Sequence, residues 1–159
     1  MANVLAQLSS LAWPFVMRAI RLVFVPNAVR LAVLRAWGAQ IERGVLMRPR
    51  VTVTWPGRLV IGADSWIGEA VTLDNAGPIR IGADVVVSQS ATLRSPAGTG
   101  ELVVDDGAWI TLRATVTGPV TIGRGAVVGA AAEVRGDVAP RTVVVSTTVI
   151  PDASDPDNI

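Results

Sequence analysis

Residues 61–93 read IGADSWIGEAVTLDNAGPIRIGADVVVSQSATL, and an aliphatic residue returns in this stretch at steps of six, with one longer step between Leu73 and Ile81. Glycine often follows the aliphatic residue directly, and a small or β-branched residue usually stands four positions after it. The aliphatic positions over the whole chain are Ile41, Met47, Val53, Ile61, Ile67, Leu73, Ile81, Val87, Leu93, Val104, Ile110, Val116, Ile122, Val128 and Val134. A fixed short period of this kind indicates a repeat architecture in which each unit packs on its neighbours.

Three six-residue units make one turn of a triangular prism, so that the aliphatic and small positions face inward and stacked turns share a core. We therefore predict an all-β fold, a left-handed parallel β-helix over residues 39–145, whose left-handed turns depart from the usual right-handed crossover. Extra residues fall where turn-forming residues gather, at Pro56-Gly57, Gly77-Pro78 and Ser95 to Gly100. A β-sandwich would show period-two alternation, and an α/β domain would show helical segments, which the repeat region lacks.

The two ends of the chain lack the repeat. Residues 1–38 combine large apolar side chains with four arginines, and we expect an N-terminal helical segment of two short helices broken at Pro14 and Pro26. The apolar stretches are too short to span a bilayer, because a crossing needs about 20 apolar residues. These helices therefore either cap the open first coil or make peripheral contact with a membrane. Residues 146–159 are expected to form an irregular tail. The expected location is cytoplasmic, and membrane-peripheral if the helices bind lipid.

Composition excludes several kinds of chemistry. The 14 basic and 13 acidic side chains leave a formal net charge of +1, so nucleic acid is not an expected partner. The chain has no cysteine and no histidine, which removes thiolate nucleophiles, the commonest base near neutral pH and the usual sulfur and nitrogen ligands of metals. No metal site is therefore predicted.

Several segments resemble the hexapeptide-repeat acyltransferases, in particular the branch of colanic acid and exopolysaccharide O-acetyltransferases. The similarity covers residues 37–145 approximately. The segments that carry it are Trp37 to Ile41, Arg48-Pro49, Trp55-Pro56, Ile61 to Gly68, Leu73 to Asn75, Ile81-Gly82 and Val87 to Gln89. The resemblance implies a homotrimer that takes a small-molecule acceptor and binds acyl-CoA as co-substrate between neighbouring subunits. In this family a histidine on a loop from the middle coils acts as the general base.

The resemblance assigns two positions on the acceptor side. Asn75 matches the family asparagine that lies beside the acceptor, and Gln89 matches the glutamine that leads into the catalytic loop. Each has a plainer alternative, because Asn75 can be a turn residue that bonds its own backbone and Gln89 can be a polar corner residue in water.

On the cofactor side, the backbone of Thr111-Leu112 and of Ala130-Ala131 matches the strand edges along which the family lays the pantetheine arm of CoA. Arg135 lies close to the family's basic residue for the CoA phosphate, although a lone surface arginine is the alternative. Past the last coil, Val145 to Thr148 stand where the family has Ala-Gly-Asn-Pro-Ala. Acyl-CoA is the one cofactor-like molecule that the resemblance suggests.

The family's catalytic histidine is missing. In place of the loop that ends in Ser-His-Asp or Asn-His-Asp, this chain has a shorter segment, Leu93 to Gly98. A substitute base needs hydrogen-bond reach and a pKa near the working pH. Asp74 is the first candidate, followed by Glu69 and the pair Asp105-Asp106, and each can instead be a corner residue in water.

Arg94 and Ser95 occupy the altered loop and are candidates for substrate binding. Arginine can hold an anionic group and serine can donate a hydrogen bond, whereas Ser95-Pro96 can equally be a simple turn. Trp66 and Trp109 stand at the same place in their repeat units, at an outer corner before an aliphatic residue. We predict that they belong to a trimer interface, with a substrate platform as the alternative.

Three functions follow from these observations. The first is an acyltransferase-like enzyme without a histidine base, which performs divergent acyl transfer or a repurposed step such as cyclisation or isomerisation. The second is a catalytically silent pseudoenzyme that binds a ligand or partners an active relative, and the third is a trimeric scaffold. The carbonic anhydrase activity known on this fold is excluded, because it needs histidines on zinc.

Overall fold

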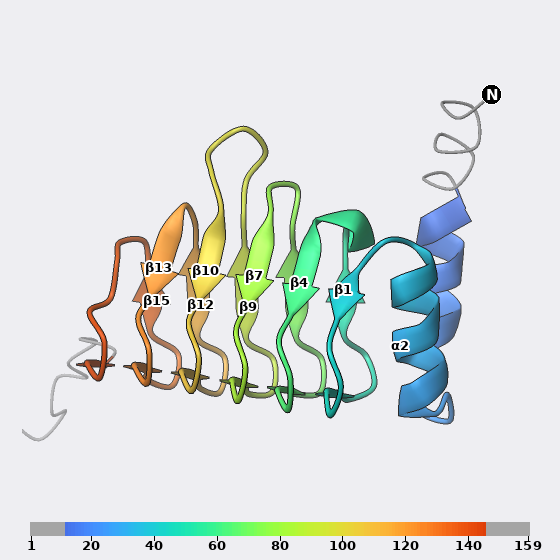
Figure 1. The fold of residues 1–159 in the computed structure, drawn as a ribbon, viewed down its shortest axis with the longest axis horizontal. Coiled ribbons are helices and arrows are strands. Elements are labelled where there is room, and N and C mark those ends of the chain that lie inside the picture. Colours follow the sequence, from blue (N-terminus) through green and yellow to red (C-terminus); the bar gives the residue numbers. More distant parts are fainter. Residues whose placement is uncertain (1–11, 146–159) are drawn as a thin grey trace, which may run out of the picture.

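Short parallel strands wind around a triangular prism in the computed structural model, which describes residues 12–145. Strands that neighbour each other in a sheet lie one turn apart in the sequence (Figure 1). Sheet A consists of β1 (Gln40–Ile41), β4 (Leu59–Ile61), β7 (Ile79–Ile81), β10 (Leu102–Val104) and β13 (Val120–Ile122). Sheet B consists of β2 (Leu46–Met47), β5 (Trp66–Ile67), β8 (Val86–Val87), β11 (Trp109–Ile110), β14 (Val127–Val128) and β16 (Val143–Val144). Sheet C consists of β3 (Thr52–Val53), β6 (Thr72–Asp74), β9 (Thr92–Arg94), β12 (Thr115–Thr117) and β15 (Glu133–Val134).

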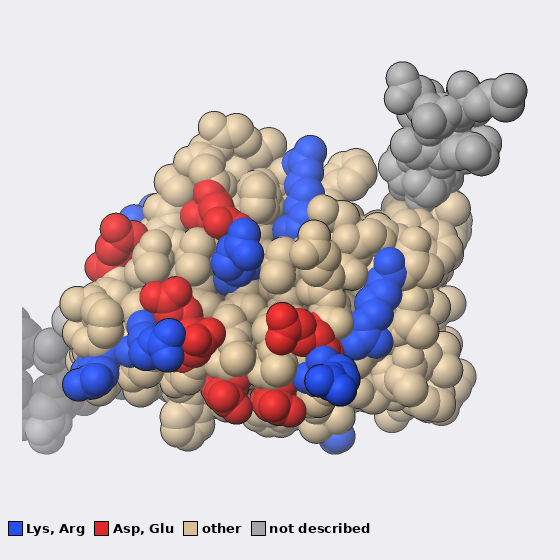
Figure 2. Space-filling view, in the orientation of Figure 1, with Lys and Arg blue, Asp and Glu red and all other residues tan. Residues whose placement is uncertain are grey.

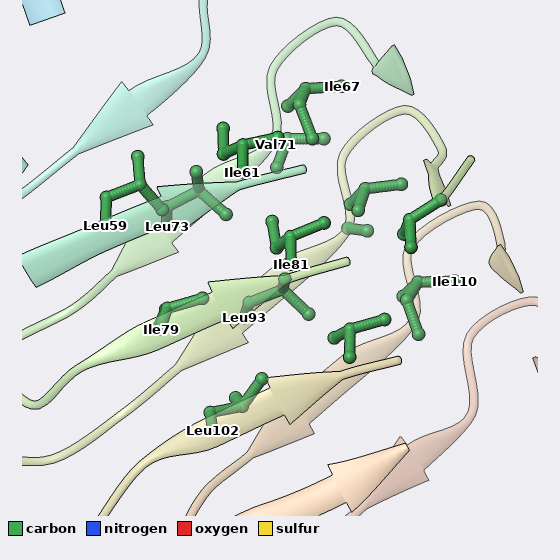
Figure 3. Close-up of a cluster of buried hydrophobic side chains, with 14 of the residues drawn as sticks. Leu59, Ile61, Ile67, Val71, Leu73, Ile79, Ile81, Leu93, Leu102 and Ile110 are labelled. Carbon is green, nitrogen blue, oxygen red and sulfur yellow. The ribbon is translucent and has the colours of Figure 1, made fainter. Parts of the chain in front are cut away.

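The predicted left-handed parallel β-helix is confirmed, and its inward register is the one that the repeat predicts. In sheet A, for example, Ile61 pairs with both Ile41 and Ile81. Every aliphatic position of the repeat is buried, and so is the residue four positions later, except after Val53 and Leu93, where the exposed Gly57 and Ala97 belong to the longer corner connections. Figure 3 shows these side chains stacked inside the prism, with Leu59, Ile79 and Leu102 forming a further row. Full burial of each Leu or Ile stabilises the fold by roughly 1.5–3 kcal/mol, so repetition along the prism builds its stability.

Glycine follows the aliphatic residue because neighbouring coils approach each other closely there. A Cβ atom on Gly62 would lie 2.5 Å from the carbonyl carbon of Gly82, and one on Gly68 would lie 2.8 Å from the backbone nitrogen of Gln89. The left-handed backbone conformation of the corner stands two positions later, at Asp64 (φ 57°) and Ala70 (φ 58°). The corner torsion is therefore adopted by residues other than glycine, and the hydrogen bonds between coils hold it.

Two helices precede the first coil, one over residues 12–20 of the described chain and the other α2 (Asn27–Ala36). Pro26 stands directly before α2, as predicted. The predicted break at Pro14 is wrong, because the described helix runs through it. The neighbouring Trp13 and Met17 are buried in the core, and this packing holds the segment around Pro14 against the prism. Within residues 12–145, no helix combines the length and the apolar content of a bilayer crossing.

The helices cap the open end of the prism, where the backbone of the first coil would otherwise lack partners. Arg30 is 2% exposed, and its guanidinium donates to the carbonyls of Met47 at 2.6 Å, Ile20 at 3.0 Å and Val25 at 3.0 Å. Burial lowers the pKa of Arg30 below its ordinary value, and the charge of Arg48 lowers it further. The predicted helical cap is thus confirmed, and one arginine ties both helices to the first coil.

Insertions gather at one edge of the prism, the edge between the strands of sheet C and those of sheet A, which we call the loop edge. It carries the 3-10 helix η1 (Pro56–Arg58) and, as its longest connection, the loop from Ser95 to Glu101 between β9 and β10. This loop stands out above the other connections in Figure 1. The tail predicted for residues 146–159 lies outside the described residues.

Candidate functional site

The candidate residues fall on two different edges of the prism. Five candidates lie at the loop edge: Asp74 and Arg94 are the last residues of β6 and β9 in sheet C, and Asn75, Ser95 and Arg135 follow strands of that sheet. The other candidates follow strands of sheet B and lie at the edge between sheets B and C, which we call the narrow edge: Gln89, Thr111, Leu112, Ala130 and Ala131. Within one chain, the outer face of sheet C separates the acceptor-side residues from most of the CoA-side residues.

Asp74 and Arg94 form an ion pair on the surface of the loop edge. They are direct partners in the ladder between β6 and β9, and the Nε atom of Arg94 donates to Oδ2 of Asp74 at 3.1 Å. The other carboxylate oxygen accepts only a long contact of 3.5 Å from the hydroxyl of Thr54. The side chains are 39% and 54% exposed. The pair therefore presents an oriented carboxylate oxygen and a cation to solvent, side by side.

Asn75 holds the corner of the preceding coil. Its side chain is 0% exposed, and its Oδ1 accepts from the backbone N–H groups of Thr54 at 3.1 Å and Trp55 at 2.8 Å. Its Nδ2 donates to the carbonyl of Trp55 at 2.6 Å. The alternative of a turn residue bonded to its own backbone is wrong in detail, since the bonds reach the neighbouring coil. With these bonds made, Asn75 acts on the loop edge through the backbone that it positions.

Ser95 fixes the base of the long loop. It is 0% exposed, its hydroxyl donates to the carbonyl of Gly100 at 3.3 Å, and its carbonyl accepts from the N–H of Gly77 at 2.6 Å. Its own N–H donates to the carbonyl of Asp74 at 2.9 Å. The turn interpretation of Ser95 therefore describes its observed contacts, and Arg94 is the residue of this pair that is open to a ligand.

At the narrow edge, successive coils stack through their backbone. The N–H of Arg113 donates to the carbonyl of Gln89 at 3.1 Å, and the N–H of Ala131 donates to the carbonyl of Leu112 at 2.9 Å. The Thr111 hydroxyl donates to the carbonyl of Val128 at 2.7 Å and is thus engaged within the fold. Leu112, Ala130 and the side chain of Gln89 are exposed. This edge offers an exposed row of small and apolar side chains rather than a set of free polar groups.

Two exposed arginines are available for a phosphate, Arg135 at the loop edge and Arg113 at the narrow edge. Arg135 is 79% exposed and makes a long ion pair of 3.6 Å with Glu133. Arg113 is exposed at the corner next to Leu112, with φ of 56°. It is not among the residues that the sequence indicated. Its position in the repeat, equivalent to that of Ala131, could have identified it.

The other candidate carboxylates have partners of their own. Glu69 forms an ion pair with Arg50 at 3.2 Å. Asp106 accepts from the N–H of Ala83 at 2.9 Å and pairs with Arg124 at 3.0 Å, at the corner between sheets A and B. Asp74 also has a partner, Arg94, and differs from these carboxylates in its position beside the altered loop.

The outer faces of sheets B and C differ in polarity. The outward residues of sheet B form a continuous apolar row, which consists of Leu46, Trp66, Val86, Trp109, Val127 and Val143. Those of sheet C are polar: Thr52, Thr72, Thr92, Thr115 and Glu133. Trp66 and Trp109 lie on strands rather than at a corner as predicted, and Trp109 is 49% exposed with its Nε1 donating to the Ser88 hydroxyl at 3.1 Å.

Known proteins similar to this chain are acetyltransferases. "Putative colanic acid biosynthesis acetyltransferase WcaF" of Escherichia coli (strain K12), and the protein of that name from Shigella flexneri, are each 35% identical to it over 115 residues. The match covers 66% of this chain and 63% of each relative, so the chain spans less than two thirds of their length. No family model matches the chain.

Solved structures with the same fold are also acetyltransferases. The hexapeptide-repeat-containing acetyltransferase VCA0836 of Vibrio cholerae superposes with a TM-score of 0.76 at 22% identity, over 86% of this chain and 85% of that one. Its complex with acetyl coenzyme A gives a TM-score of 0.73 at 23% identity, over 83% and 79%. At this level of identity the likeness establishes the β-helical fold with its helices.

Proposed function

We propose that this chain, a homologue of the acetyltransferase WcaF with the fold of the hexapeptide-repeat acetyltransferases, transfers an acyl group from acyl-CoA to a hydroxyl of a small molecule without a histidine base. The homology supports a function within the acyltransferase family. The finer statement, that the reaction proceeds without histidine, is based on the residues at the loop edge.

The observation that carries the proposal is the exposed ion pair of Asp74 and Arg94. Arg94 orients the carboxylate through Oδ2, which leaves Oδ1 as an acceptor for the proton of a substrate hydroxyl. The hydroxyl oxygen forms a bond to the thioester carbonyl carbon, and the carbon–sulfur bond breaks. The proton passes to Asp74 and from there to the departing CoA thiolate, so that Asp74 returns to its starting state.

Loss of the histidine base is compatible with catalysis on energetic grounds. A general base contributes typically about 10²–10⁴ in rate, whereas orientation of the reactants can supply about 7–11 kcal/mol of the barrier. A site that retains orientation but relies on a weaker base is therefore slower rather than inactive.

We place acyl-CoA along the narrow edge, where the exposed Leu112, Ala130 and Ala131 leave a smooth surface for the pantetheine arm. Arg113 at this edge, and Arg135 at the loop edge of a neighbouring subunit, are the cations available to the phosphate groups of CoA. Support comes from VCA0836, a protein of the same fold whose structure holds acetyl coenzyme A.

The reaction as proposed needs a trimer. The two sets of residues lie on opposite edges of sheet C in one chain, so the loop edge of one subunit has to meet the narrow edge of its neighbour. The apolar outer row of sheet B, with Trp66 and Trp109, supplies the type of surface that subunits bury against each other. The polar outer face of sheet C is left for the groove.

A second candidate function is a ligand-binding pseudoenzyme, and one observation favours it. Asn75, which matches the asparagine beside the acceptor in the family, is fully buried and bonded to backbone. In a chain without the histidine base, an asparagine that only stabilises the backbone cannot position the acceptor. Such a chain can still bind CoA without transferring an acyl group.

Acetyl-CoA titration by calorimetry tests the proposal, with Arg135→Ala and Arg80→Ala compared with the wild type. Arg80 is the matched control, because it is exposed and paired with a glutamate, Glu101 at 3.2 Å, as Arg135 is with Glu133. We expect micromolar to millimolar binding that Arg135→Ala weakens and Arg80→Ala leaves unchanged. Absence of binding at millimolar acetyl-CoA overturns both candidate functions and leaves a scaffold. Binding without release of free CoA thiol, over a panel of hydroxylated acceptors, selects the pseudoenzyme.

A further inference from the structure

We propose that the helical cap docks onto an anionic lipid bilayer through a surface formed by the turn between the two helices and the exposed side of the first helix. The surface consists of Phe15, Leu22, Val23 and Phe24, together with the arginines Arg18, Arg21 and Arg50, and we call it the cap surface. This inference is independent of acyl transfer and of the trimer.

Large apolar side chains protrude from the cap surface into solvent. Phe24 is 80% exposed, Phe15 78% and Val23 62%. Phe24 and Val23 stand in the turn that joins the helices, at residues 21–25, where no coil of the prism covers them. Phe24 stands next to Val23 and Leu22, and a group of exposed large apolar side chains of this kind marks a site that contacts a membrane or a partner.

The charge of this end of the chain is predominantly positive. Residues 12–50 contain seven arginines and one acidic residue, Glu42, and the uncharged residues 1–11 add nothing. The rest of the chain has seven basic and twelve acidic side chains, so the small net charge of +1 conceals a basic end and an acidic body. On the face drawn in Figure 2, acidic side chains gather over the coils and none lies on the helical cap at the right end.

Cations and apolar side chains together line a hollow of about 500 Å³, which is formed by Arg18, Arg21, Leu22, Val23, Phe24 and Arg50. The hollow is built on the fold, since the N–H of Arg50 donates to the carbonyl of Arg21 at 3.0 Å. Arg50 also pairs with Glu69 at 3.2 Å, whereas Arg18 and Arg21 form no ion pair with the described residues. Two guanidinium groups without an ion-pair partner among the described residues, in a hollow that apolar side chains also line, match a phosphate headgroup whose acyl chains lie alongside.

This combination favours a bilayer over other anionic partners. Nucleic acid would use the cations but would leave the protruding apolar side chains in water. An acidic protein would need a surface whose shape matches the cap surface. A bilayer accepts apolar side chains and phosphate-binding cations on the same face.

Vesicle co-sedimentation of the full chain tests the proposal. The probes are vesicles of phosphatidylcholine alone and vesicles in which about a third of the lipid is phosphatidylglycerol. We expect sedimentation with the anionic vesicles only, and weaker binding at high salt because the interaction is screened. Arg18→Gln/Arg21→Gln should weaken partitioning on the order of tenfold or more, at about fivefold for each arginine. Phe24→Ser should weaken it about tenfold, through lost apolar insertion.

The control is Arg124→Gln/Arg141→Gln, which removes the same charge from the opposite end of the prism. It should leave sedimentation unchanged. Equal loss in the control, unchanged binding in Phe24→Ser, or no binding of the wild type to anionic vesicles overturns the proposal. So does a change in oligomeric state on Phe24→Ser in the absence of lipid, which would identify a second copy of the chain as the occupant. Circular dichroism of each variant establishes that it is folded.

Discussion

At the residue scale, the side chains suggested by resemblance divide into those that hold the backbone and those that are open to a ligand. Asn75 and Ser95 are fully buried and bonded to main-chain groups, whereas Asp74 and Arg94 are partly exposed. The same short stretch therefore combines structural and chemical residues in alternation, because successive residues of a strand end point to opposite sides.

Asn75→Ala is expected to destabilise the fold. The substitution leaves two backbone N–H groups and one carbonyl at the neighbouring corner without their partner, at a cost of about 2–4 kcal/mol in free energy of unfolding. Urea unfolding followed by tryptophan fluorescence measures this loss. Gln89→Ala changes an exposed amide whose side chain forms no hydrogen bond with the described residues, and it should change stability by less than about 0.5 kcal/mol. Equal stability of the two variants would refute the structural role of Asn75.

Asp74→Asn is expected to lower the rate of acyl transfer about 10²–10⁴-fold while leaving acetyl-CoA affinity unchanged, because the amide cannot take the proton from the acceptor. Thiol release from acetyl-CoA and calorimetry give the two readouts. Asp84→Asn is the control, since Asp84 is an exposed carboxylate at the corner between sheets A and B. An unchanged rate in Asp74→Asn removes this residue from the mechanism.

At the element scale, the coil depends on close approach at each corner and on the cap at its first turn. Neighbouring coils approach within contact distance where glycine follows the aliphatic residue. The cap supplies partners to the first coil: the Asn27 side chain donates to the Val45 carbonyl at 3.0 Å and accepts from the Met47 N–H at 2.9 Å. The coils are thus held by backbone contacts that recur from one coil to the next. At the first coil, which has no preceding coil, the cap supplies these contacts instead.

Gly62→Ala is expected to cost about 1–3 kcal/mol, because the added methyl group meets backbone atoms of the next coil, which cannot move aside. Gly136→Ala is the matched control, since its Cβ would have no atom within 4 Å. Thermal unfolding of both variants measures the difference. Comparable melting temperatures would show that the coils can separate without cost.

Arg30→Met is expected to loosen the cap, because the carbonyls of Met47, Ile20 and Val25 lose their donor in a buried site. We expect a loss of about 3 kcal/mol and faster proteolysis of residues 12–36. Arg43→Met, at an exposed position of the first corner, should have little effect. If protease cleaves the helices of Arg30→Met no faster than those of the control, the hydrogen bonds of Arg30 do not hold the helices on the first coil.

At the scale of the whole molecule, polarity differs between faces and charge differs between ends. The apolar outer row belongs to sheet B, the threonine row to sheet C, and the basic residues gather at the cap. These asymmetries orient the proposed assembly, with sheet B between subunits, the groove along sheet C and the cap toward lipid.

Trp109→Glu is expected to shift the assembly from trimer to monomer, because a carboxylate would be buried without a partner against the neighbouring subunit. Sedimentation velocity measures the change. Val103→Glu introduces the same charge on the outer face of sheet A at a neighbouring coil position and should leave the trimer intact. A monomeric wild type, or equal dissociation of both variants, contradicts the assignment of sheet B to the interface.

The repeat in residues 41–134 determined the fold and its register, because in a prism the distance from one aliphatic residue to the next decides which side chains face inward. Even the corner insertions were visible, since proline and glycine mark turns. Resemblance supplied the candidate residues, but it could not assign their contacts.

Only the tertiary structure decided which candidates are open to a ligand. Asn75 and Ser95 bond with residues about one coil away or across a loop, and Asp74 meets Arg94 only because β6 and β9 are in register. The exposed cap surface was likewise beyond the sequence pattern, because capping and membrane contact use the same apolar and basic residues. The sequence therefore determined the prism through local periodicity, and the structure decided the site and the cap surface through contacts between segments distant along the chain.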